Sequence, residues 1–236
     1  MSDFERRDAQ VTARPYEAIG EPTERAAFIT RTYAHLLGAV VAFVAIEWVL
    51  FSTGVAWTMA RAMLSTSWLL VLGGFVLVSW IASAVAHRVT SPVAQYAALA
   101  GFVVAEAIIF VPLLAIAFSR VPGAVQSAAT VTALGFLALT AVAFMSRKDF
   151  SFLGASLRWV GLMALVAIVA AVIFGFELGT WFSVGMIALA GVAILYDTSN
   201  VIHHYPTDRH VAASLQLFAS VALMLWYVLR LFMSRD

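Results

Sequence analysis

Cysteine is absent from this 236-residue chain, and charged side chains make up only 11% of it, whereas hydrophobic residues make up 63%. Without cysteine there is neither a disulfide nor thiolate chemistry. Soluble domains carry roughly 25% charged residues, so the shortage of charge excludes a water-soluble fold. The net charge of +1 gives no indication of a nucleic-acid partner.

The sequence also lacks the common signatures of enzyme sites. It contains no phosphate-binding loop, nucleophile elbow, HExxH pair or dinucleotide fingerprint, so we expect neither catalytic residues nor a cofactor. Four candidate metal ligands lie close together near the carboxyl end: His203, His204, Asp208 and His210. Their spacing matches no strong ligand pattern, so we expect loop histidines that sense pH or cap helices, and no metal site.

Long apolar runs are the main feature that is present. A helix needs about 20 apolar residues to cross the hydrocarbon layer. Seven runs qualify: Tyr33–Ser52, Trp68–Ala86, Val93–Phe118, Ala124–Met145, Phe152–Phe174, Trp181–Ile202 and Val211–Met233. Alternation of apolar and polar residues with a period of two is absent, so an outer-membrane β-barrel is excluded. The first run is too long for the core of a signal peptide, so we retain it as a helix. The sequence therefore predicts an all-α integral membrane protein, a bundle of seven helices in the lipid bilayer.

The chain divides into a polar tail, residues 1–31, and a membrane domain, residues 32–236. The tail mixes acidic and basic residues with proline and glycine, so we expect it to be largely disordered up to about Glu21. Lys and Arg are retained on the cytoplasmic side of membranes. We therefore place the amino terminus in the cytoplasm, because this orientation leaves only four basic residues outside: Arg61, Arg120, Arg230 and Arg235. The carboxyl terminus is then outside, unless the last run turns back as a re-entrant helix.

Asp197 is an acid inside the sixth apolar run. Such a residue costs about 2.5–3.5 kcal/mol on insertion scales, so it is usually retained for a reason. Asp197, Asn200 and His204 lie at i, i+3 and i+7, on one helix face that leads to the cytoplasmic end. Burial favours the neutral carboxyl and hydrogen-bond donors favour the charged one, so Asp197 can act as a pH switch. The alternative is a hydrogen-bonded structural link.

The seventh run carries polar residues with a matching spacing. Gln216, Ser220, Tyr227 and Arg230 follow a 4-7-3 pattern, which is typical of a packed helix face. The connection from the sixth run is short, so the two helices are antiparallel neighbours. This register places Ser220 near the depth of Asp197 and Arg230 near the outer end.

Two further acids lie in earlier runs. Glu106 lies near the middle of the third run, six residues before Pro112, which can kink a helix. It either lines a water-filled path or is a neutral acid bonded to a neighbour. Glu47 lies in the outer third of the first run, within reach of Arg61, and we expect a structural role for it.

The stretches Ala193–His203, Ala212–Ser220 and Tyr227–Arg230, together with Ser146–Gly154 and Arg31–Tyr33, resemble the Bax inhibitor-1 family. The resemblance implies a seven-helix fold with a short last helix at its centre, and a pH-sensitive calcium leak. It also implies a sensor made of one aspartate in each of the last two helices. Asp197 matches the first position, but Ser220 occupies the second, so the acid pair is not present.

In having serine at position 220, the chain is similar to a bacterial branch of the family, the modulators of the FtsH membrane protease. The chain is similar to them in Asp197–Asn200, in Arg147–Asp149 and in Ser234–Asp236. This resemblance implies the bacterial inner membrane, and a tail that a membrane-bound ATP-dependent protease can grip.

Two hypotheses follow. The first is a calcium or other cation leak gated through Asp197, with Ser220, Asn200, His204 and Arg230 in the gate and with Glu106 and Gln216 along the pathway. The second is a non-conducting modulator of the protease that acts through the tail and the cytoplasmic loops.

Overall fold

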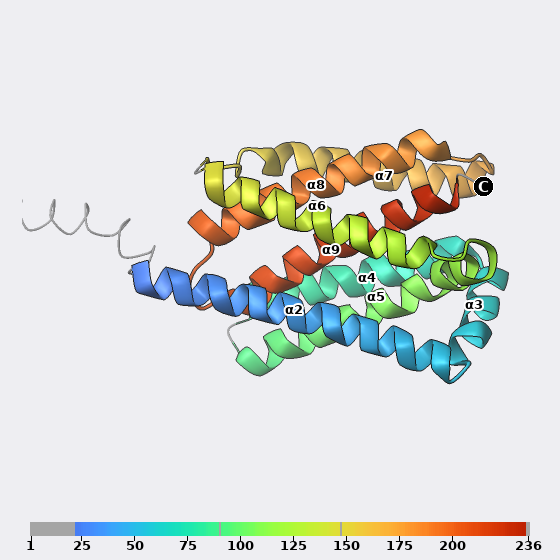
Figure 1. Ribbon diagram of the computed structural model, residues 1–236, viewed down its shortest axis with the longest axis horizontal. Helices are drawn as coiled ribbons and strands as arrows, with labels where there is room; N and C mark the ends of the chain where they lie inside the picture. Colours follow the sequence, from blue (N-terminus) through green and yellow to red (C-terminus); the bar gives the residue numbers. More distant parts are fainter. Residues whose placement is uncertain (1–21, 90, 147, 235–236) are drawn as a thin grey trace, which may run out of the picture.

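The computed structural model describes residues 22–89, 91–146 and 148–234, and within these ranges all the regular secondary structure is helical (Figure 1). Seven of the helices described there are long and apolar enough to cross a membrane. They are α2 (Pro22–Ser52), α4 (Trp68–Arg88), α5 (Pro92–Arg120), α6 (Ala124–Ser146), α7 (Leu153–Phe174), α8 (Gly179–His203) and α9 (His210–Met233). The predicted fold class, a seven-helix membrane bundle, is confirmed.

The helix α2 begins earlier than the apolar run from which it was predicted. Proline is tolerated in the first turn of a helix, where its missing N–H has no partner in any case, and Pro22 is the first helical residue. Glu24 follows in the first turn, where a negative charge is favourable. Residues 22–31, which the sequence groups with the tail, are therefore helical. The segment that we expect to be disordered, up to about Glu21, lies outside the described residues.

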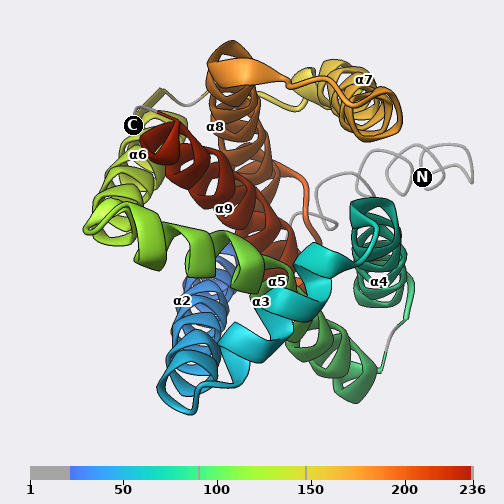
Figure 2. The same ribbon diagram turned by 90° about the vertical axis from the view of Figure 1, so that its right-hand side faces the viewer.

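The helix α3 (Val55–Ser65) was not predicted from the sequence. Its 11 residues are too few to cross a membrane. Gly54, with a φ of 78°, allows the chain to turn out of α2, and α3 then buries Ala56 and Ala60 against Val111 and Ala115 of α5. The helix thus covers one end of α5 (Figure 2).

The last helix, α9, lies at the centre of the bundle, where it packs against α2, α4, α5, α6 and α8 (Figure 2). The central position implied by the family resemblance is found, but the short length is wrong. With 24 residues α9 is longer than α4, α6 and α7, and it extends about 36 Å. It is continuous, and it ends at the opposite end of the bundle from Pro22 (Figure 1). A re-entrant last helix is therefore not observed.

The helix α7 lies at the periphery. It packs on α8 and makes only slight contact with α4, and Figure 2 shows it standing apart from the rest of the bundle. Both α4 and α7 contribute side chains to the wall of a large cavity.

Candidate functional site

A cavity of about 1180 Å³ is lined by side chains of α4, α5, α7, α8 and α9. Its lining extends from His204 and Tyr205, which follow α8, to Arg230 and Met233 near the end of α9. All seven candidate site residues line it: Glu106, Asp197, Asn200, His204, Gln216, Ser220 and Arg230. The fold thus brings together, on one internal surface, residues that are far apart in the sequence.

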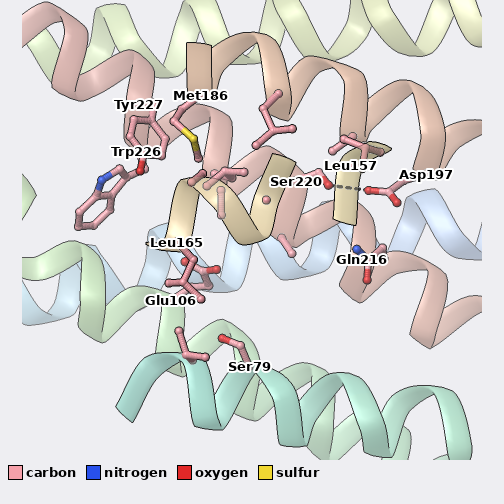
Figure 3. A pocket seen from close by; sticks show the side chains of 18 of the residues that line it. Ser79, Glu106, Leu157, Leu165, Met186, Asp197, Gln216, Ser220, Trp226 and Tyr227 are labelled. Atoms are coloured by element: carbon pink, nitrogen blue, oxygen red, sulfur yellow. Dashed lines mark hydrogen bonds between the residues drawn. The ribbon is translucent and has the colours of Figure 1, made fainter. Parts of the chain in front are cut away.

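The centre of the site is a hydrogen bond between α8 and α9. The Ser220 hydroxyl donates to Oδ2 of Asp197 at 2.5 Å (Figure 3). Asp197 is 2% exposed and Ser220 is 5% exposed, so the pair is shielded from lipid and solvent by the surrounding helices. The antiparallel packing of α8 on α9 produces this pairing, because it places the two residues at the same depth.

Two amides flank the pair. Asn200 lies about one turn from Asp197 on α8, and Gln216 lies about one turn from Ser220 on α9; both are partly buried and line the cavity. Arg230 lies ten residues beyond Ser220, which is about 15 Å along the helix. The guanidinium of Arg230 therefore belongs to the far end of the cavity rather than to the Asp197 pair.

Glu106 faces the cavity from α5, and Figure 3 shows it on the same side as Ser79 of α4. It is 6% exposed, and no described side chain forms a hydrogen bond with its carboxyl group. The helix continues through Pro112 as far as Arg120.

Glu47 is a third buried acid in the membrane domain, and it lies outside the cavity. Both of its oxygens lack a hydrogen-bond partner among the described residues. Arg61, which the sequence places within its reach, instead donates from Nε to the carbonyl of Trp57 on its own helix. A Glu47–Arg61 contact is therefore not formed.

His204 is paired with an acid that the sequence analysis did not select. Its Nε2 lies 2.8 Å from Oδ2 of Asp149, in the segment that joins α6 to α7. The Asp149 carboxylate also accepts hydrogen bonds from the backbone N–H of Ser151 and from the Ser199 hydroxyl. The bond from Ser151, together with the one from His204, lowers the pKa of Asp149. The family-like stretch Ser146–Gly154 contains this acid and could have indicated it.

The other histidines of the predicted cluster separate in space. His203 bonds through Nδ1 to the Ser199 carbonyl, whereas the His210 ring lies 4.9 Å from that of His35, between ring centroids. Within the described ranges, no group of three or more His, Asp or Glu residues is arranged to hold a metal ion.

Tyr205 closes the end of the cavity nearest His204. Its hydroxyl lies 3.0 Å from Nε2 of His87 on α4, and burial raises the pKa of its phenol. Arg25 of α2 donates from Nη1 to the carbonyls of Tyr205 at 2.6 Å and Val201 at 3.3 Å. The sequence analysis missed these contacts, because hydrogen bonds to distant backbone carbonyls leave no pattern in the sequence.

Comparison with known proteins agrees with this architecture. The family model described as "Inhibitor of apoptosis-promoting Bax1" matches residues 25–236, which include all the membrane-spanning helices almost in full. No curated protein matches the chain. The matched region covers the cavity, the Asp197–Ser220 pair and the Arg25 contact. The chain therefore belongs to the Bax inhibitor family, and it is a multi-pass membrane protein.

Proposed function

We propose that this protein is a cation leak of the bacterial inner membrane, with calcium as its first candidate ion, gated through Asp197. The observation that supports this most is the position of that acid: it is buried among membrane helices, beside a long cavity, and is held by one hydrogen bond from Ser220. Ionisable residues inside membrane domains commonly mark ion pathways.

The other polar residues of the cavity fit this role. Asn200 and Gln216 carry amide oxygens on either side of Asp197, and Glu106 adds a second carboxyl group farther along. Calcium is a hard cation that takes oxygen ligands. Bulky apolar side chains also line the cavity, including Trp226 (Figure 3), so we assign this arrangement to the closed state.

The gating step follows from the hydrogen bond itself. A hydroxyl that donates to a carboxylate forms a charge-assisted bond, which is stronger than the bond to a neutral acid. Protonation of Asp197 would therefore weaken the tie between α8 and α9, and we expect the leak to increase as the pH falls. His204 and Asn200 would form the mouth of the pathway on the cytoplasmic side, where we place the amino terminus.

The test uses purified full-length protein in liposomes that contain a calcium-sensitive dye, over a series of pH values. We expect the wild type to pass calcium in a pH-dependent manner, Asp197→Asn to lose the pH dependence, and Ser220→Ala to leak more at neutral pH. Ser214→Ala is the matched control, because the Ser214 hydroxyl bonds within its own helix to the Val211 carbonyl. Equal flux through wild type and Asp197→Asn at every pH would eliminate the proposal.

A second candidate, modulation of a membrane-bound ATP-dependent protease, is favoured by the contact of Arg25. This residue anchors the start of α2 to the α8–α9 connection, so the start of α2 is held at the end of the bundle that also carries the Asp149 segment. Deleting residues 1–21 should change association with the protease and the half-life of the protein, and leave calcium flux in liposomes unaltered. Unchanged association and turnover would count against this role.

A further inference from the structure

The cavity is bounded by two helices that hardly touch each other. Both α4 and α7 contribute side chains to its wall, yet α7 rests mainly on α8. Figure 2 shows the two helices apart on the outer side of the bundle. Val76 of α4, which lines the cavity, is 39% exposed, and the lining residues Leu165 and Ile168 of α7 are partly exposed. In a bilayer this side faces lipid, so the cavity opens laterally toward the acyl chains.

The walls next to this opening are suited to a hydrocarbon chain. Phe75 and Leu72 line it from α4, and Leu165 and Ile168 line it from α7. Gly161 also lines the wall on α7, and a Cβ added there would meet no atom within 4 Å. The groove therefore has room beside α7 that the protein does not fill.

Basic side chains mark one end of the same groove. Arg158, one turn before Gly161, lines the cavity and is exposed, and its Nε donates to the carbonyl of Gly154. His87 lines the cavity from the last turn of α4, which ends with Arg88. Among the described residues no carboxylate forms an ion pair with Arg158, since Asp149 pairs with His204 and Asp208 pairs with Arg209.

We infer that the groove between α4 and α7 binds one anionic glycerophospholipid, with an acyl chain in the cavity and its phosphate at Arg158. The apolar wall selects the chain, and the positive charge at one end selects the anionic headgroup, because each basic residue near an anionic lipid surface contributes attraction. The lipid thus completes the wall that α4 and α7 leave open. This binding does not depend on whether the protein conducts ions.

The test measures lipid retention by native mass spectrometry of the full-length protein after delipidation. The protein is reloaded with phosphatidylglycerol or with phosphatidylcholine of the same acyl chains. We expect the wild type to retain phosphatidylglycerol preferentially, and Arg158→Gln to reduce that retention about fivefold, as expected for roughly 1 kcal/mol per basic residue. Gly161→Phe, which places a ring in the groove, should reduce retention of both lipids.

Arg61→Gln is the matched control. Like Arg158, Arg61 is exposed and donates from Nε to a carbonyl of its own helix, but it lies on α3, away from the groove. Retention that is unchanged in Arg61→Gln and reduced in Arg158→Gln supports the site. Equal retention of the two lipids by the wild type, or an equal loss in the two arginine variants, would overturn it. Displacement by glycerol phosphate alone would assign the site to a soluble phosphate and would overturn it as well.

Discussion

The hydroxyl of Ser220 on α9 and the carboxyl group of Asp197 on α8 are joined by a hydrogen bond of 2.5 Å, and both side chains are buried. The acid therefore faces a neighbouring helix and the internal cavity rather than the acyl chains. The hydrogen bond between the two residues fits a gating role for Asp197, in which the bond to α9 forms in one state and breaks in the other.

Replacing Ser220 with alanine should destabilise the bundle by about 1 kcal/mol. Interhelical hydrogen bonds in membranes average about 0.6 kcal/mol, and the substitution also leaves a buried acceptor without its donor. The free energy of unfolding can be measured by denaturation in mixed micelles. Ser214→Ala, on the same helix and also buried, removes a bond within its own helix and should have a smaller effect. An equal loss in the two variants would contradict this prediction.

Replacing Arg25 with alanine should loosen the end of α8. The guanidinium bonds to the carbonyls of Val201 and Tyr205, and hydrogen bonds to charged groups contribute about 1.5–3 kcal/mol. We expect amide hydrogen exchange over residues 200–206 to accelerate at least tenfold. Arg31→Ala, an exposed position nearly two turns farther along α2, should leave this exchange unchanged. Protection that persists in Arg25→Ala would show that the contact is not stabilising.

Replacing Gly154 with alanine should weaken the packing of α7 on α8. An added Cβ would lie 2.8 Å from ring atoms of Tyr196, so the ring must move. Overpacking of this kind costs typically about 1–3 kcal/mol, and the mobility of a tyrosine ring favours the low end of the range. Thermal unfolding in detergent should show a lower midpoint for Gly154→Ala than for the wild type. When Tyr196→Ala is present in both chains, Gly154→Ala should no longer lower the midpoint.

The control for this position is Gly161→Ala on the same helix. A Cβ there meets no atom within 4 Å, and alanine is the better helix former by about 0.8–1.0 kcal/mol. This variant should therefore be at least as stable as the wild type. Similar losses at both glycines would argue against a specific contact with Tyr196.

The Asp149–His204 contact predicts a pH dependence of stability. A carboxyl group whose pKa is lowered by folding stabilises the protein at pH values above its ordinary pKa of 3.8, and this contribution is lost as the pH falls through the lower folded value. The difference in unfolding midpoint between wild type and Asp149→Asn should therefore be constant near neutral pH and decrease below about pH 4.

The magnitude of this effect should be small, because the His204 and Asp149 side chains are 47% and 45% exposed and solvent screens their interaction. Asp208→Asn is a suitable control: its carboxylate, also exposed, lies 3.6 Å from Arg209 and does not contact His204. A difference between wild type and Asp149→Asn that increased toward low pH would have the wrong sign.

The membrane-spanning helices could be predicted from the sequence, because the hydrocarbon layer requires a run of apolar residues that polar segments do not provide. The depth of Ser220 relative to Asp197 could be predicted as well, since a short connection leaves little freedom to the register of two antiparallel helices. The sequence did not predict α3, because its 11 residues are buried on one side only and form no membrane-length run.

The contacts of Arg25 with Val201 and Tyr205 could not be predicted, because they join residues more than 170 positions apart and their acceptors are backbone carbonyls. The pairing of Asp149 with His204 depends in the same way on how the α6–α7 segment folds back onto the end of α8. The side-chain type alone does not indicate which of several exposed acids pairs with His204. The cavity could not be predicted either, because it results from the position of α7 relative to the other helices rather than from any one stretch of residues.

The central position of α9 has a consequence for biosynthesis. Five of the other helices pack against it, yet it follows all of them along the chain. Chains emerge from the ribosome amino terminus first, so the earlier helices enter the membrane before their common packing partner exists. Until α9 is inserted, its neighbours must expose inward-facing surfaces to lipid or to a chaperone, and the bundle can close only after α9 has been translated.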